Sequence, residues 1–149
     1  MKTIVVALDF SDSTAKVLAA AVELARAFQA SLHLVHVMEA EPAYTAYGFT
    51  PDEFPAINTF QEEARKRAAV KLDELLASVS SEVTDVRTKL VDGTPLHALL
   101  DYVREIGADL VAMGSHGHGV VASLLLGSVA EGMVRKAAVA TLVVPVKES

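Results

Sequence analysis

The feature that most constrains this chain is its alternation of short apolar runs with longer stretches in which apolar residues recur every three or four positions. Uninterrupted apolar runs of about four to eight residues are typical of strands buried on both faces, and the longer spacing is typical of helices with one buried face. The predicted strands span residues 3–8, 32–38, 83–91, 110–113 and 141–146, of which residues 83–91 show mixed alternation instead of a continuous apolar run.

The helices predicted between these strands have recognisable starts. Ser11, Asp12 and Ser13 can cap the first helix, and Thr59 with Glu62 has the spacing of a capping box. The other expected helix boundaries are Thr94–Pro95 and Gly107 for the third helix and Ser128 for the fourth. The residues expected to face the core are Val17, Ala21, Leu24, Ala25 and Phe28; Phe60, Ala64, Ala68, Leu72, Leu75 and Leu76; Leu96, Leu99, Leu100 and Val103; and Val129, Met133, Val134 and Ala137.

This order of elements predicts a single α/β domain over residues 1–149, a five-stranded parallel sheet sandwiched by four helices, as in Rossmann-like folds. A stretch rich in proline and tyrosine, residues 39–57, is expected to be a surface insertion. In such sheets ligands bind beyond the carboxyl ends of the strands, where the strand order reverses. Asp9, Val37 and Gly114 each fall at or near the end of a predicted strand, so we expect them along one edge of the sheet.

Composition excludes several classes of function. The formal net charge is −6 without a cluster of basic residues, which argues against a nucleic-acid surface. There is no cysteine, which excludes disulfides, thiol catalysis and thiolate metal sites. No apolar window has the length of a membrane helix, and the first apolar run is too short for a signal peptide, so we expect a cytoplasmic protein.

The fourth predicted strand is followed by a glycine-rich loop. Residues 113–119 read Met-Gly-Ser-His-Gly-His-Gly, and residues 126–129 read Leu-Gly-Ser-Val. Glycine lets backbone N–H groups approach an anion closely, and the start of a helix favours a phosphate. Ser115 and Ser128 add hydroxyl donors. This pattern predicts a phosphate site, although a tight turn without a ligand would also explain the glycines.

Three known motifs are excluded at this loop. A Walker A loop requires lysine and a hydroxyl residue where Val120 and Val121 stand. The dinucleotide fingerprint would have to follow the first strand and precede an acidic residue by about twenty positions, and neither holds here. A nucleophile elbow needs a residue between Gly114 and Ser115.

Gly114, Gly117, Gly127 and Ser128 fit the pattern G-x-x-G-x(9)-G-[ST], which resembles the ATP-binding signature of the universal stress protein family. Runs along the whole chain are similar to that family: Asp9-Phe10-Ser11, residues 34–37, residues 109–114 and residues 141–146. The resemblance implies an adenine-nucleotide alpha-hydrolase-like fold and, because every signature glycine is present, the ATP-binding branch.

The resemblance also implies roles for individual residues. Asp9 would accept hydrogen bonds from ribose hydroxyls, the backbone of Val37 would meet the adenine, and Ala7 would line the base pocket. The residues implied along the ribose and phosphates are Met113, Gly114, Ser115, Gly117, His118 and Gly119, with Gly127, Ser128 and Val129 at the phosphate tail. No lysine or arginine lies between Gly114 and Val134, so the backbone, hydroxyls, His118 or a bound Mg²⁺ would meet the phosphate charge.

Several alternatives stay open at this stage. Asp9 could instead cap the first helix. His33 and His36 fall on opposite faces of a strand and cannot share a metal ion, so structural roles are favoured; His97 is expected at the surface. His116 and His118 lack the further ligands that zinc needs.

Pro145 marks the last strand as an edge strand, and the resemblance implies a homodimer through residues 141–146. The resulting hypothesis is an ATP-, ADP- or AMP-binding stress-response regulator that acts through a protein partner. A slow ATPase using the same pocket and a nucleotide-free interaction module are the alternatives; no residue is an evident general base.

Overall fold

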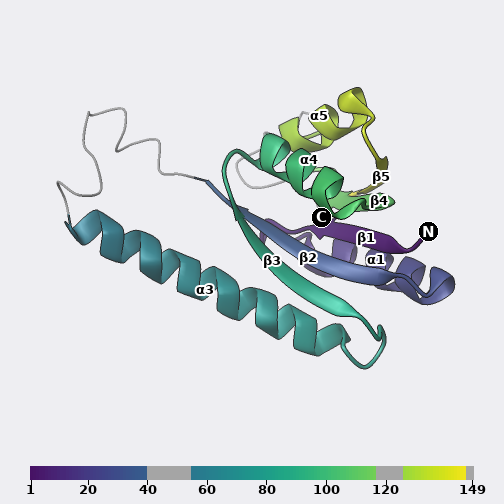
Figure 1. Ribbon diagram of the computed structural model, residues 1–149, viewed down its shortest axis with the longest axis horizontal. Helices are drawn as coiled ribbons and strands as arrows, with labels where there is room; N and C mark the ends of the chain where they lie inside the picture. The colour runs from purple at the N-terminus through teal and green to yellow at the C-terminus, as the bar shows by residue number, and fades with distance from the viewer. Residues whose placement is uncertain (40–54, 117–125, 147–149) are drawn as a thin grey trace.

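The computed structural model describes residues 1–39, 55–116 and 126–146 (Figure 1). Its strands are β1 (Thr3–Ala7), β2 (Ser31–Met38), β3 (Val86–Asp92), β4 (Leu110–Gly114) and β5 (Ala140–Val144). The helices in the described parts are α1 (Thr14–Phe28), α3 (Pro55–Val79), α4 (Pro95–Ile106) and α5 (Ser128–Lys136).

The five strands form one parallel sheet in the order β3-β2-β1-β4-β5, which confirms the predicted fold class. β1 is central, and the order of strands reverses between β1 and β4. Asp109 joins the starts of these two strands, because its Oδ2 accepts hydrogen bonds from the Lys2 and Thr3 N–H groups at 2.7 and 2.9 Å.

Helices cover both faces of the sheet, with α1 and α3 on one side and α4 and α5 on the other (Figure 1). The alternating residues of β1 supply both cores: Ile4 and Val6 pack with α1 and α3, and Val5 packs with α4 and α5. Each such fully buried side chain contributes about 1.5–3 kcal/mol of hydrophobic stabilisation. Burial on both faces therefore explains why β1 reads as an uninterrupted apolar run.

The start of α3 differs from the prediction. The helix begins at Pro55, so the supposed capping box of Thr59 and Glu62 lies inside it. Proline suits a first helical turn because the N–H that it lacks would have no partner within the helix. Residues 55–57 of the expected insertion therefore belong to α3, and residues 40–54 lie outside the described residues.

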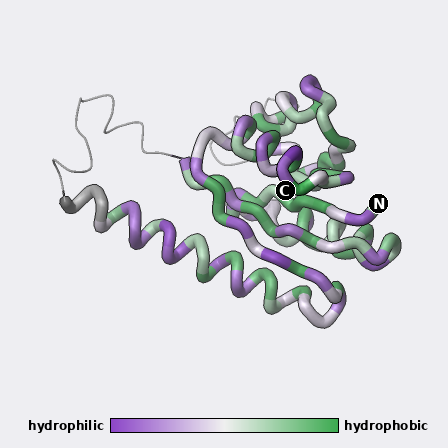
Figure 2. Tube along the Cα trace, in the orientation of Figure 1, coloured by the Kyte–Doolittle hydropathy of each residue, from purple (hydrophilic) through white to green (hydrophobic). Residues whose placement is uncertain are grey.

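Part of the predicted buried face of α3 is exposed. Ala68 and Leu72 are buried, but Phe60 is 50% exposed. The N-terminal part of α3 extends past the sheet (Figure 1), so the helical spacing there faces no core formed by described residues. Figure 2 shows hydrophilic residues interspersed along the helix, whereas the middle of β1 is hydrophobic.

The other predicted boundaries are close to the observed ones. α4 has Thr94 as N-cap and ends at Gly107, whose φ of 64° suits glycine. β3 begins at Val86 rather than residue 83, and β5 ends at Val144, directly before Pro145.

Further predictions about the caps and buried faces of the helices were wrong. Gly127 rather than Ser128 is the N-cap of α5, and Phe28, Val134 and Ala137 are exposed. None of the helices described is long and apolar enough to cross a membrane.

Candidate functional site

A cavity of about 670 Å³ lies at the carboxyl edge of the sheet. It lies against the ends of β1, β2 and β4 and the first residues of α1, α4 and α5. This is the place where the strand order reverses, and ligands bind there in open parallel sheets. Its volume falls within the range of small-molecule sites, about 300–1,000 Å³.

The structure brings the described members of the predicted site to this one cavity. They come from the ends of three strands and the start of α5, far apart in the sequence. The predicted residues that line the cavity are Ala7, Asp9, Val37, Met113, Gly114, Ser115, Gly127, Ser128 and Val129. Gly117, His118 and Gly119 lie outside the described residues.

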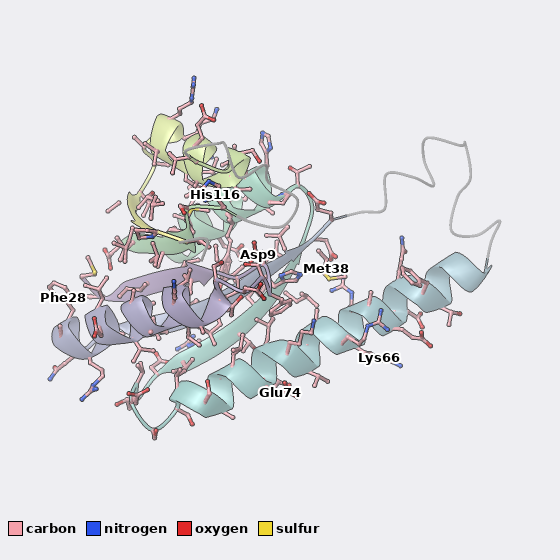
Figure 3. The ribbon with its side chains drawn as sticks, turned by 180° about the vertical axis from the view of Figure 1, so that it is seen from behind. Asp9, Phe28, Met38, Lys66, Glu74 and His116 are labelled. Atoms are coloured by element: carbon pink, nitrogen blue, oxygen red, sulfur yellow. The ribbon has the colours of Figure 1, made fainter. Side chains whose placement is uncertain are left out.

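Asp9 lies in the turn between β1 and α1, at the same edge as Met38 and His116 (Figure 3). Its Oδ1 accepts a hydrogen bond from the Ser11 N–H at 3.0 Å. Because α1 begins later, with Ser13 as its N-cap, Asp9 does not cap this helix. No hydrogen bond from a described residue reaches its Oδ2, which leaves that oxygen available to a ligand.

Gly114 allows β4 to pass close to the start of α1. A Cβ atom at this position would lie 3.1 Å from Ser13 Oγ and 3.3 Å from the His116 carbonyl oxygen. Both neighbours line the cavity. A larger residue here would therefore crowd the floor of the site.

Ser115 ties the loop after β4 together. Its N–H donates to the Val144 carbonyl at 2.9 Å, and its carbonyl accepts from the Gly127 N–H at 2.7 Å. Its buried Oγ accepts from the Val146 N–H at 3.0 Å and shares a hydrogen bond with His116 Nδ1 at 3.1 Å. Ser115 thus has structural partners, and it brings Gly127 and the start of α5 back to the end of β4.

The start of α5 presents backbone donors to the cavity. Gly127 is the N-cap and makes no side-chain capping bond, and Ser128 is the exposed first residue. The first N–H groups of a helix have no partner within the helix, and the helix dipole places partial positive charge there. Asp9 and Glu39 are the charged side chains among the described lining residues, so an anion at α5 would depend on these backbone groups.

Sequence reasoning did not assign to the site the start of α4 or Thr14. Leu96 and Leu99 form an apolar wall together with Val37, and Thr94 and Pro95 lie beside it. The sequence signal that could have placed the start of α4 at the site is the Thr94–Pro95 helix start, because it follows the end of a strand, β3. Thr14 also lines the cavity, and its Oγ1 is buried without a hydrogen-bond partner.

His33 and His36 make structural hydrogen bonds, as predicted, and His36 also lines the cavity. His33 Nδ1 shares a 2.8 Å hydrogen bond with the Tyr102 hydroxyl, and His36 Nδ1 bonds the Leu8 carbonyl at 2.7 Å. His97 is exposed and bonds Thr94 Oγ1 at 3.2 Å. Within the described ranges, no three histidine or acidic side chains come together as a metal site.

The fold and cavity define a parallel α/β protein with a ligand site at the point where its strand order reverses. Residues 1–145 match the profile of the Universal stress protein family. The chain is 32% identical over 148 residues to Universal stress protein A homolog 1 of Coxiella burnetii, covering 99% of this chain and 98% of the relative. This chain therefore belongs to the universal stress protein family, as the sequence motifs predicted.

Solved structures agree on the fold. Universal stress protein UspA from Lactobacillus plantarum has a TM-score of 0.80 at 21% identity, covering 98% of this chain and 97% of that one. A universal stress protein in complex with cAMP has a TM-score of 0.70 at 27% identity, covering 99% of this chain and 98% of that one.

Proposed function

We propose that this universal stress protein binds an adenine nucleotide, ATP, ADP or AMP, in the cavity and acts as a nucleotide-dependent regulator. The observation that carries the proposal is the meeting of Asp9, Gly114 and the uncapped start of α5 around one cavity at the point where the strand order reverses. A family member with 27% identity was solved with cAMP, which supports an adenine nucleotide as the ligand.

Each part of a nucleotide has chemistry to match it in the cavity. Val37, Met113 and Leu96 offer an apolar environment for the base, with the Val37 backbone as its polar partner. The free oxygen of Asp9 would accept hydrogen bonds from the ribose hydroxyls. The N–H groups at the start of α5 would bind the phosphates.

The phosphate charge must be met without lysine or arginine from the described lining residues. Backbone N–H groups, the Ser128 hydroxyl and the glycine loop of residues 114–119 are the donors that we propose. Mg²⁺ bound together with a di- or triphosphate would neutralise part of the charge.

We also propose that two copies pair through β5. The two edges of the sheet differ: β3 carries the exposed Arg87 and Lys89, whereas β5 reads Ala-Thr-Leu-Val-Val without a charge. Charged side chains protect an edge strand from pairing, and an uncharged apolar edge favours it. A symmetric dimer would satisfy the open hydrogen-bonding groups of β5.

The ligand itself can be identified directly. Purified protein is heat-denatured, and the released small molecules are separated and identified by mass spectrometry. Bound ATP supports the regulator. ADP, together with turnover of added ATP, supports a slow ATPase instead. An empty pocket that binds no adenine nucleotide in a titration supports a nucleotide-free interaction module.

Glycine substitutions test the proposed phosphate site. Gly117→Val and Gly127→Val should abolish ATP binding, measured by titration calorimetry, while circular dichroism shows an intact fold. Ala138→Val is the matched control, because Ala138 is exposed and does not line the cavity. Unchanged ATP affinity in either glycine variant would place the phosphates elsewhere.

A further inference from the structure

The turn that carries Asp9 has an unfavourable backbone conformation at its centre. Leu8 still pairs with the sheet, its N–H donating to the Val35 carbonyl at 2.8 Å, but the next residues leave it. Phe10 has a φ of 59°, in the left-handed region that disfavours residues with a side chain. Such a conformation persists only where surrounding contacts hold it.

Contacts from two other elements hold this turn. The Phe10 ring stacks on His36 of β2, with ring centroids 4.3 Å apart and planes 28° apart. Lys71 of α3 places its Nζ 5.2 Å from the centre of the same ring. A cation over an aromatic face is attracted by the ring electrons, so α3 also secures Phe10.

His36 holds the peptide that precedes Asp9. Its Nδ1 lies 2.7 Å from the Leu8 carbonyl oxygen. A carbonyl oxygen only accepts hydrogen bonds, so Nδ1 carries the proton and donates. The same ring thus bonds the backbone before Asp9 and stacks on the side chain after it.

Asp9 is therefore restrained on both sides. His36 fixes the Leu8 carbonyl, and the Ser11 N–H donates to Asp9 Oδ1 at 3.0 Å. Phe10, which lies between these two bonds, does not line the cavity, whereas His36 does. We propose that Phe10 and His36 are positioning residues that hold the Asp9 carboxylate ready to accept hydrogen bonds from a sugar diol. This inference rests on the proposed function and adds the residues that make the nucleotide site selective for ribose.

The test compares ATP with 2′,3′-dideoxy-ATP by titration calorimetry. For the wild-type chain we expect ATP to bind about tenfold more tightly, as for one or two hydrogen bonds to a carboxylate. Phe10→Gly permits the same φ but removes the ring, and should lower this ratio about threefold or more while dideoxy-ATP affinity stays unchanged. Phe10→Tyr keeps the ring and should keep the ratio.

His36→Phe gives a second test that holds even if Phe10→Gly fails to fold. It retains an aromatic ring beside Phe10 but cannot donate to the Leu8 carbonyl, and should also lower the ratio. In an Asp9→Ala background neither substitution should change it further. A ratio unchanged in both variants, or an equal loss for both nucleotides, overturns the positioning role. If the wild-type chain binds no ATP, the proposed function fails, and this inference fails with it.

Discussion

His33 is a buried histidine whose environment favours its neutral form. Burial lowers the pKa of His33 below its ordinary value of 6.5, and the charge of Arg87 lowers it further, while Asp85 opposes the shift. Below pH 6.5 the unfolded chain therefore binds a proton at this residue more readily than the folded chain. The contribution of neutral, buried His33 to the free energy of unfolding is therefore fully present above pH 6.5. It is lost as the pH falls through the lowered pKa.

We expect the free energy of unfolding to be lower at about pH 5 than at about pH 7.5, measured with urea. His33→Gln should reduce this pH dependence, because glutamine does not titrate. The substitution leaves every other side chain unchanged, so the difference between the two curves isolates His33. Two parallel curves would contradict the prediction.

Tyr102 is the hydrogen-bond partner of His33, and both side chains are buried. Tyr102→Phe keeps the ring but leaves the buried His33 Nδ1 without this partner. An unsatisfied buried polar group costs about 1–3 kcal/mol, so we expect a loss of that size in urea unfolding near neutral pH. A double-mutant cycle with His33→Phe tests the pair directly, and additive losses would argue against a specific role of this hydrogen bond.

At the scale of elements, α5 ends at an alanine in a conformation that suits glycine. Ala137 is the C-cap with a φ of 48°, and its N–H donates to the Met133 carbonyl at 3.1 Å. Ala137→Gly should raise the free energy of unfolding by about 0.5 kcal/mol, because glycine adopts this conformation without steric cost. Ala138→Gly is the control: the φ of Ala138 is not positive, so this substitution should lower the free energy of unfolding. Destabilisation by both glycines would contradict the prediction.

The contact between α4 and α5 depends on Gly132. A Cβ atom there would lie 2.5 Å from Leu96 Cδ2, too close for both side chains to stay in place. Alanine would gain about 1 kcal/mol in helix propensity, but displacing Leu96 costs about 1–3 kcal/mol. We expect Gly132→Ala to destabilise the protein by about 1 kcal/mol in thermal or urea unfolding.

Leu96→Ala removes the obstructing side chain, so in that background Gly132→Ala should become neutral or stabilising. A double-mutant cycle measures this change of sign as a coupling energy. Additive effects would show that the two side chains do not compete for the same space.

At the scale of the whole molecule, the proposed pairing through β5 predicts a change of oligomeric state. Val143 is a partly buried residue of this edge strand, and Val143→Lys places a charge on an apolar edge. We expect the wild-type chain to be a dimer and this variant a monomer in size-exclusion chromatography with light scattering. Lys89→Glu on the opposite edge is the control and should leave the dimer intact. A monomeric wild-type chain would contradict the pairing.

The central strands of the sheet were predictable from local sequence, because burial on both faces requires continuous apolar residues. The strands predicted at residues 3–8 and 110–113 differ from β1 and β4 by one residue each. The start of α3 was not predictable in this way, because its N-terminal part extends past the sheet (Figure 1). Phe60 has helical spacing but is 50% exposed. Likewise Val134 has the right spacing on α5 but is 51% exposed, since none of the described elements covers it. The cytoplasmic location expected from the sequence stays a prediction.

By itself the sequence determined the α/β class and the family, and it predicted Asp9, Ser115, Ser128 and the glycines of the candidate site, because each has a local signature: an apolar run, a strand end or a glycine spacing. Tertiary structure decided the strand order, the apolar wall from α4, and the contacts of Phe10, Ser115 and Gly132. These depend on which segments become neighbours after folding. No local pattern specifies a neighbour in space, so only the folded chain shows why Phe10 adopts a conformation that its own side chain disfavours.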